Sequence, residues 1–229
     1  MNKTSLNILA ALAACFGVCN AQANLLNNGS FEIGAPSNGC VAGTSALSGW
    51  SVVAGNIDID SARPGCSGGF SIAAADGDFF IDLTGSAMGG AGKISQVIAT
   101  EIGQSYALGF WFGGNSAWQY YGGMPNDGPI KSMDVVIDGV RLGNFSVDTS
   151  GRANNDAAWV YKTLTFEAGL NSTELRFESQ NSYGVFGPYL DGVSLEVASP
   201  APIPEPETYV LMLTGFAAVA AAARRRRAR

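Results

Sequence analysis

The chain has no histidine among its 229 residues. Its absence removes the most common general base and any Ser-His-Asp arrangement for nucleophilic catalysis. Cysteine is scarce as well: two of the four lie before residue 20, and the remaining pair, Cys40 and Cys66, is too small for an ordinary zinc site. Glycoside hydrolysis by two carboxylates is the enzymatic chemistry that remains, because acidic residues are plentiful. We expect a protein that is not an enzyme, with a surface glycoside hydrolase as the alternative.

Basic residues are few in the central part of the chain. Of the 13 lysines and arginines, Lys3 and five C-terminal arginines lie in terminal segments. Residues 24–203 therefore carry seven basic and 17 acidic side chains, a net charge of −10. Phosphate backbones are bound by clustered lysine and arginine, which this region lacks. We expect no nucleic-acid partner.

The first 23 residues have the pattern of an export signal. A charged start at Lys3 is followed by an apolar stretch from Leu6 to Val18 and by Ala21-Gln22-Ala23, typical of a secretory signal peptide over residues 1–23. A buried N-terminal helix is the alternative structural interpretation. The segment Leu12-Ala13-Ala14-Cys15 also resembles a lipoprotein box, which would leave a lipidated Cys15 as the first residue.

Export places Cys40 and Cys66 in an oxidising compartment. A lone cysteine pair there predicts a disulfide, with two free buried thiols as the alternative.

The region from residue 24 to 198 reads as β-structure throughout. Apolar and polar residues approximate a period of two in several short runs, which glycine, asparagine, aspartate and serine clusters separate. No stretch shows a convincing helical stripe. The runs are Trp50–Val53, Phe79–Leu83, Ile94–Ile98, Tyr106–Phe112, Ser132–Val140, Val160–Phe166, Glu174–Ser179 and Val193–Val197. Eight or nine short strands without helical crossovers predict an all-β domain, an antiparallel β-sandwich or jelly roll.

The last 31 residues differ in composition from this domain. Residues 199–208 contain four alternating prolines and predict a stiff linker. Residues 209–223 are apolar and are followed by an arginine cluster at 224–229. Fifteen helical residues reach roughly 22 Å, short of a bilayer core of about 30 Å. Because arginine stems snorkel and basic clusters stay cytoplasmic, we expect a short transmembrane helix with a cytoplasmic arginine cluster. A C-terminal core helix is the alternative.

This tail resembles the PEP-CTERM sorting signal. The resemblance lies in Pro204-Glu205-Pro206, the apolar segment after it and the terminal arginines. It implies a Gram-negative bacterium that makes exopolysaccharide and a precursor tethered to the inner membrane. It also implies processing near the motif by an exosortase, and transfer to the cell surface or the extracellular matrix.

The domain itself resembles the choice-of-anchor C family and related galactose-binding-like proteins of plant cell walls. The matching segments are 24–32 (Asn-Leu-Leu-Asn-Asn-Gly-Ser-Phe-Glu), 106–115 and 187–195. The resemblance implies a galactose-binding-like jelly roll of the kind that many carbohydrate-binding modules use. It also implies a structural calcium ion between the first and last strands. Glu32 and Asp191 match those positions, and Asp60 or Asp58 would add a third carboxylate; ordinary turn-capping acids are the alternative.

Aromatic residues in polar loops suggest where a ligand could bind. Trp118, Tyr120 and Tyr121 lie between Gly114 and Gly123, and Tyr183 and Phe186 lie in a second loop. An exposed ring offers a flat apolar face to a pyranose.

Polar residues near these rings could complete such a site. Asn115, Gln119 or Asp127 would bind sugar hydroxyl groups. A protein contact or local loop packing is the alternative role of the rings. In the strand at 106–112, either Trp111 or the pair Phe110 and Phe112 is expected in the core.

Taken together, these patterns predict an exported, non-catalytic protein that binds polysaccharide or an envelope glycan. A structural matrix protein with protein partners is the rival interpretation.

Overall fold

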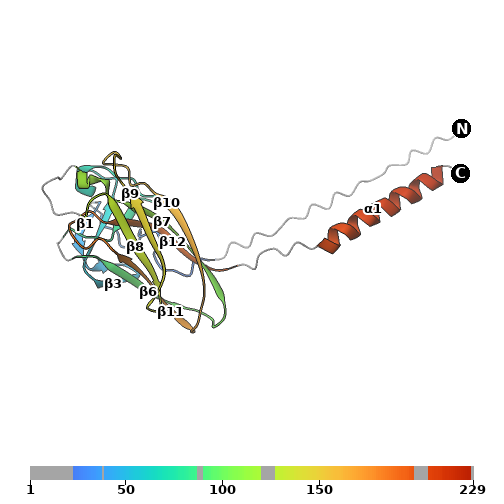
Figure 1. Ribbon diagram of the computed structural model, residues 1–229, viewed down its shortest axis with the longest axis horizontal. Helices are drawn as coiled ribbons and strands as arrows, with labels where there is room; N and C mark the ends of the chain where they lie inside the picture. The colour runs from blue at the N-terminus through green and yellow to red at the C-terminus, as the bar shows by residue number, and fades with distance from the viewer. Residues whose placement is uncertain (1–22, 38, 87–89, 120–126, 199–205, 228–229) are drawn as a thin grey trace. The chain divides into compact units, whose positions relative to one another are not determined.

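The computed structural model describes residues 23–227 apart from 38, 87–89, 120–126 and 199–205 (Figure 1). The chain divides into two units, Met1–Val197 and Ala198–Arg229, which are described separately. Residues 1–22 of the predicted signal peptide, Cys15 among them, lie outside the described residues.

The first unit consists of two six-stranded sheets, in which every pairing is antiparallel. Sheet A has the order β1-β4-β5-β12-β7-β10, and sheet B has the order β2-β3-β6-β11-β8-β9. The strands are β1 (Val41–Thr44), β2 (Ala46–Leu47), β3 (Trp50–Ala54), β4 (Ile57–Ser61), β5 (Phe79–Asp82), β6 (Lys93–Ala99), β7 (Ser105–Gly114), β8 (Ile130–Ile137), β9 (Val140–Asp148), β10 (Val160–Glu167), β11 (Ser172–Ser179) and β12 (Pro188–Val197). The prediction of an all-β antiparallel fold is confirmed.

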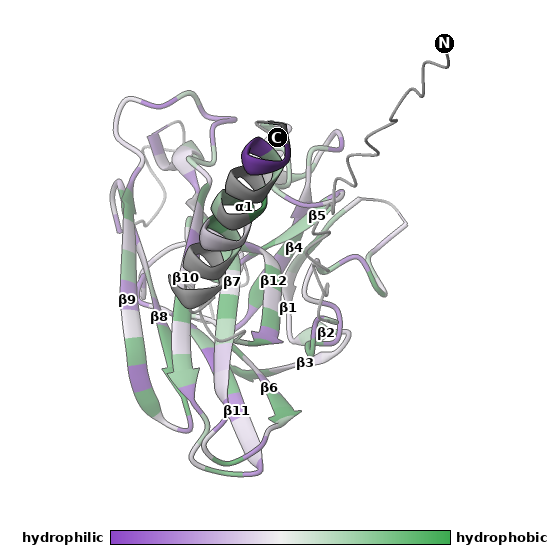
Figure 2. Ribbon diagram, turned by 90° about the vertical axis from the view of Figure 1, so that its right-hand side faces the viewer, coloured by the Kyte–Doolittle hydropathy of each residue, from purple (hydrophilic) through white to green (hydrophobic). Residues whose placement is uncertain are grey.

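The core lies between the two sheets and consists of side chains that alternate along most of the strands. Phe110 and Phe112 of β7 are fully buried and belong to one cluster with Phe177, Met133 and other residues of sheet B. Each buried aliphatic or aromatic side chain contributes about 1.5–3 kcal/mol through removal of apolar area from water. Figure 2 shows the hydrophobic and hydrophilic bands that follow one another along β9. This alternation fixes which face of each strand points inward.

The predicted strands correspond to observed ones, with one division. The run 132–140 is split between β8 and β9 by a turn at Asp138, which has a positive φ of 48°. The run Ile57–Ser61 was not predicted and forms β4, a strand whose five residues are all buried. Two aspartates in five residues weaken the sequence signal for a buried strand. In the structure, Asp58 accepts hydrogen bonds from the N–H groups of Gly43 and Ser86, and Asp60 lies next to the disulfide.

A second, smaller apolar cluster lies on the outer side of sheet A. Phe80 and Tyr189 project from β5 and β12, and Ile72 and Ala157 cover them from the connecting segments. Trp159 packs against both rings, with centroid distances of 5.6 Å to Phe80 and 5.9 Å to Tyr189. Trp159 is thus a partly buried member of this outer cluster. Part of the outer face of sheet A is thus buried beneath loops.

The disulfide Cys40–Cys66 is present, with a Cα–Cα distance of 5.7 Å. It joins the start of β1 to the excursion between β4 and β5. The prediction from the cysteine count is confirmed.

The second unit contains one described helix, α1 (Pro206–Arg227), which is longer than the predicted segment 209–223. Among the described residues, no helix is long and apolar enough to cross a bilayer. The membrane-spanning role of this segment stays a prediction. Pro204 and Glu205 of the sorting motif lie outside the described residues, and Pro206 begins the helix.

Candidate functional site

Two residues of the predicted aromatic loop have structural partners. Asn115 is buried; its amide donates a hydrogen bond to Asp82 Oδ2 (3.1 Å), and its Oδ1 accepts one from the N–H of Ala117 (3.0 Å). Trp118 is half-buried in a short 3₁₀ turn, and its indole N–H donates to Thr149 Oγ1 at 2.9 Å. The polar atoms of Asn115 thus hold the end of sheet A together, and its role as a ligand-binding side chain stays a prediction.

The second predicted loop contains one exposed ring. Tyr183 is 60% exposed, and its backbone N–H donates to Asp127 Oδ2 at 2.9 Å. Phe186, next to β12, is 5% exposed, so this apolar side chain is withdrawn from water, and its role in ligand binding stays a prediction. Tyr120 and Tyr121 lie outside the described residues.

The carboxylates predicted to bind calcium both cap one backbone segment. Glu32 Oε1 accepts hydrogen bonds from the N–H groups of Asp78 (2.8 Å) and Phe79 (2.9 Å). Asp191 Oδ2 accepts from Ala75 and Asp76, both at 2.8 Å. Burial raises the pKa of Asp191 to about 7, although these backbone donors act against the rise. The pattern matches turn-capping acids, and a calcium ion at Glu32 and Asp191 stays a prediction.

Asp60 lies elsewhere, next to the disulfide. Among the described residues, one group of three metal-ligating side chains has its ligand atoms within 4.8 Å of one another: Cys40, Asp60 and Cys66. The two sulfurs are bonded to each other and are not thiolate ligands. The structure therefore does not place Asp60 in one such group with Glu32 and Asp191.

The outer faces of the two sheets differ in chemistry. On sheet B, Glu178 pairs with Lys93 (2.7 Å) and with Arg176 (2.6 Å), and Asp134 pairs with Arg141 (3.6 Å). Such an ion-paired face is typical of a sheet that faces water. The outer face of sheet A has aromatic rings instead, beyond the part that loops cover.

Trp111 and Tyr161 form a ring pair on this face. They are register partners on β7 and β10, and their ring centroids are 5.2 Å apart in an edge-to-face arrangement. Because Phe110 and Phe112 point into the core, Trp111 points outward. Tyr161 is 46% exposed and Trp111 is half-buried. An outward aromatic pair on an open sheet is a surface that apolar ligand faces can cover.

Two glycines allow these rings to lie close to the sheet. A Cβ on Gly109 would lie 2.1 Å from Tyr161 Oη and 3.0 Å from Ser194 Oγ. Gly192 has a positive φ of 51° within the irregular register of β12, and a Cβ there would lie 2.9 Å from Trp111 Cδ1. The same position on Gly192 is 3.6 Å from Asp76 Oδ2. The ring pair is therefore bordered by a hydroxyl group and an exposed carboxylate, the acceptors that sugar hydroxyl groups bind.

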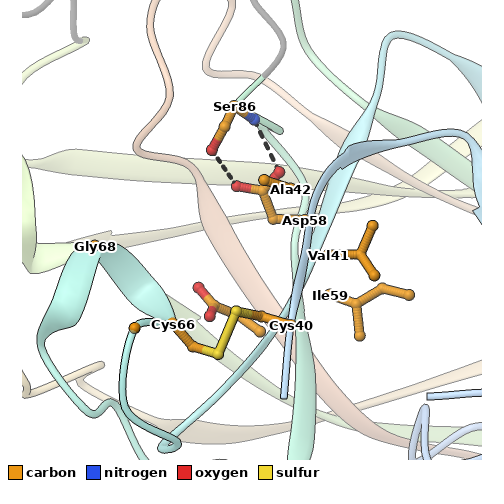
Figure 3. Close-up of a pocket in the computed structure, with 10 residues that line it drawn as sticks. Cys40, Val41, Ala42, Asp58, Ile59, Cys66, Gly68 and Ser86 are labelled. Carbon is orange, nitrogen blue, oxygen red and sulfur yellow. Dashed lines mark hydrogen bonds between the residues drawn. A yellow bond between two sulfur atoms is a disulfide. The ribbon is translucent and has the colours of Figure 1, made fainter. Parts of the chain in front are cut away.

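A pocket of about 100 Å³ opens beside the disulfide (Figure 3). Asp58, Asp60, Ser86 and the bridged cysteines are among the residues that line it. Figure 3 shows Asp58 joined to Ser86 by two hydrogen bonds, one from the backbone N–H to Oδ1 at 2.8 Å and one from the hydroxyl group to Oδ2. Asp58 Oδ1 also accepts from the N–H of Gly43 at 2.5 Å. This carboxylate thus links β4 to β1 and to the loop after β5.

Sequence reasoning missed both the ring pair and the pocket. The strict alternation Phe110-Trp111-Phe112 leaves two assignments, one with the tryptophan inside and one with it outside. Nothing in the sequence around Tyr161 indicates that its side chain lies beside another ring. The pairing of β7 with β10 brings together Trp111 and Tyr161, which are 50 positions apart. Gly109 is the one local signal, because a glycine inside a strand often marks a close approach.

Comparison with known proteins gives one family match. The family model described as "Protein of unknown function (DUF642)" matches residues 24–196. Halomucin of Haloquadratum walsbyi is 27% identical over 201 residues, which is 84% of this chain. The chain spans 2% of the length of halomucin. The matched model differs from the choice-of-anchor C family, and that resemblance stays a prediction, as does the sorting signal.

Several solved structures are similar to the β-rich unit. TmCBM61, solved in complex with β-1,4-galactotriose, has a TM-score of 0.48 and 15% identity, covering 77% of this chain and 99% of that chain. A family 35 carbohydrate-binding module from Clostridium thermocellum has a TM-score of 0.43 and 13% identity, covering 69% and 98%. The arabinose-bound α-L-arabinofuranosidase MgGH51 has a TM-score of 0.48 and 13% identity, covering 80% and 28%. At these TM-scores and identities, the ligands and activities of those proteins are not transferred to this chain.

Proposed function

The chain belongs to the DUF642 family, and from its surface geometry we propose that the β-sandwich binds a polysaccharide without catalysing a reaction. The observation that carries this proposal is the Trp111–Tyr161 pair on the open face of sheet A. Ring faces favour the apolar side of a pyranose, and Asp76 and Ser194 beside them offer acceptors for its hydroxyl groups.

Charge narrows the class of polysaccharide. Residues 24–203 have a net charge of −10, and the carboxylate of Asp76 lies beside the rings. Acidic polymers are repelled by such a surface, especially at low ionic strength. We therefore assign a neutral or cationic glycan as the ligand.

We further propose that the domain acts outside the cytoplasm. The Cys40–Cys66 disulfide supports this location, because such bonds persist in oxidising compartments. The pattern of residues 1–23 and the Pro204-Glu205-Pro206 motif support export followed by exosortase processing. The place of action is then the cell surface or the extracellular matrix.

Isothermal titration against a panel of neutral polysaccharides tests the binding proposal. In Trp111→Ala we expect the affinity for the bound glycan to fall about tenfold, which corresponds to ~1.4 kcal/mol of lost stacking. Tyr161→Ala is expected to act in the same direction. Thermal unfolding should change little in either variant, since both side chains lie on the outer face.

Tyr183→Ala is the matched control, because that ring is exposed in the loop between β11 and β12 and not on the outer face of β7 or β10. It should bind the glycan like the unaltered chain. If Tyr183→Ala abolished binding while Trp111→Ala did not, the ligand would lie at the loop end and the assignment to sheet A would be wrong.

A further inference from the structure

Beyond the ring pair, the outer face of sheet A continues along β7 with very small side chains. Trp111 points outward, so Gly109 and Ala107, which precede it at alternate positions of the strand, lie on the same face. Tyr161 Oη reaches as far as Gly109, since a Cβ on this glycine would lie 2.1 Å from it. The rings therefore end above Gly109, and the next outward group of β7 is the methyl group of Ala107.

Polar side chains border this part of β7 on both sides. Its hydrogen-bonded neighbours are β10 and β12 (Figure 2). The register partners of the two small residues are Thr163 and Thr165 on β10, and Ser194 and Glu196 on β12. Both threonines are exposed, while the serine and the glutamate are half-buried. We name this surface the polar strip, which consists of Ala107, Thr163, Thr165, Ser194 and Glu196.

The hydroxyl groups of the polar strip are not used by the fold. Among the described residues, none forms a hydrogen bond with the hydroxyl group of Thr163, Thr165 or Ser194. The hydroxyl group of Thr100, in contrast, donates to a backbone carbonyl at 2.8 Å. Each hydroxyl group of the strip therefore keeps one donor and its acceptor capacity for a ligand.

The open surface is elongated and continues from the rings in one direction. From Trp111 to Ala107 there are four residues, roughly 13 Å at about 3.3 Å each, and the two strand spacings from β10 to β12 add a width of roughly 10 Å. On the other side of Trp111 the face is covered. A Cβ on Gly113 would lie 2.8 Å from the ring of Trp159, whose N–H donates to the carbonyl of Ala73 at 2.9 Å. A ligand on the rings therefore extends toward Ala107.

We propose that the polar strip and the ring pair together bind a linear segment of the glycan, with several successive sugar residues lying along β7. The proposal rests on the proposed binding of a glycan and specifies the form in which the glycan is recognised. A single terminal sugar is held best by a concave pocket that surrounds it. On a flat strip each sugar buries little area, so affinity accumulates over several sugars in a row. The carboxylate of Glu196 accepts hydrogen bonds from hydroxyl groups and disfavours acidic sugars at this end of the chain.

Oligosaccharides of one to six sugar residues, cut from the polysaccharide that binds in the titration panel and separated by size, test the proposal. Isothermal titration measures the affinity of the unaltered chain for each length. We expect the affinity to rise about tenfold or more from the disaccharide to the tetrasaccharide. It should then level off, because longer oligosaccharides extend beyond the strip.

Two variants change the polar strip without touching the rings. Ala107→Gln places a longer, uncharged side chain in the path of the glycan; it should bind the disaccharide like the unaltered chain and lose the gain in affinity with length. Thr165→Val exchanges a hydroxyl group for a methyl group of similar size and should reduce this gain several-fold. Ala99→Gln is the matched control, because Ala99 is exposed on β6 of sheet B, and it should keep the full gain. Thermal unfolding verifies that each variant is folded, and Thr165→Val decides the test if Ala107→Gln does not fold.

The outcomes separate this inference from the proposed function. If no polysaccharide of the panel binds, the proposed function fails. If the disaccharide binds as tightly as the hexasaccharide, or if Ala107→Gln and Thr165→Val keep the full gain with length, the glycan-binding function stands and the extended strip is overturned. A gain that Ala99→Gln reduces as strongly as Ala107→Gln does would also overturn the inference.

Discussion

Asp82 joins three segments at one end of sheet A. Its Oδ1 accepts from the N–H of Thr84 at 2.8 Å, and its Oδ2 accepts from Asn115 and from the N–H of Gly187. Burial and then Asp58 raise its pKa well above 3.8, against these donors. A single buried carboxyl group thus orders the loop end, and burial favours its protonated form.

This raised pKa predicts how stability depends on pH. The folded protein keeps a proton on Asp82 that the unfolded chain releases near pH 4, so stability is lost as the pH rises from about 4 toward the folded-state pKa. Asp82→Asn removes this titration, and its free energy of unfolding should vary less between pH 5 and pH 8. The variant is also expected to be about 1–3 kcal/mol less stable, since one buried donor loses its acceptor. Urea unfolding at both pH values measures this, and equal slopes for the two proteins would refute it.

Single residues were the hardest feature to predict from the sequence. Asn115 and Phe186 lie in glycine-rich, polar segments, which suggested exposure, yet both are buried. Exposure depends on which segments return to cover a loop, and that information is not local. Trp50, in contrast, begins one of the predicted strands and is 7% exposed, with its N–H donating to the carbonyl of Asn28 at 3.1 Å.

At the scale of elements, the proposed binding surface is formed by β7 and β10, and Gly109 of β7 leaves room for the ring of Tyr161. Tyr161 leans over Gly109, where a side chain would collide with its hydroxyl group. The period-two pattern predicted both strands, because large apolar residues recur at every second position of each. Their pairing and the outward direction of Trp111 follow from strand order, which the pattern alone leaves undetermined.

Gly109→Ala tests whether this packing matters. The new methyl group should displace the Tyr161 ring, which is the free end of an exposed side chain, so the cost in stability is small, about 1 kcal/mol or less. Glycan affinity, measured by titration, should fall several-fold because the ring no longer lies beside Trp111. Gly169→Ala, where nothing lies within 4 Å of the added carbon, is the control. Unchanged affinity in Gly109→Ala would show that Tyr161 needs no fixed position.

At the scale of the whole β-rich unit, one face of the sandwich is ion-paired and the other has the rings and the pocket. The disulfide fastens the excursion between β4 and β5 over the second face, across a sequence separation of 26. The cysteine count and compartment predicted this bond. The two-sheet arrangement followed from short alternating strands without helices between them.

Removing the bond should lower the stability of the folded chain. The double variant Cys40→Ser and Cys66→Ser is expected to lose about 3–4 kcal/mol of unfolding free energy by the loop-entropy estimate. Urea unfolding measures this, and adding a reductant should affect only the unaltered chain. A double variant as stable as the unaltered protein would mean that other contacts suffice to hold the excursion, among them the Ile72–Phe80 cluster and the hydrogen bonds accepted by Asp191.

The most direct test of the account is a two-dimensional ¹H–¹⁵N spectrum of the tryptophan indole groups during titration with a bound oligosaccharide. The account predicts that the Trp111 signal shifts with added ligand and that the buried Trp50 signal stays in place. A shift confined to Trp118, with Trp111 unchanged, would contradict the claim that the open face of sheet A binds the glycan.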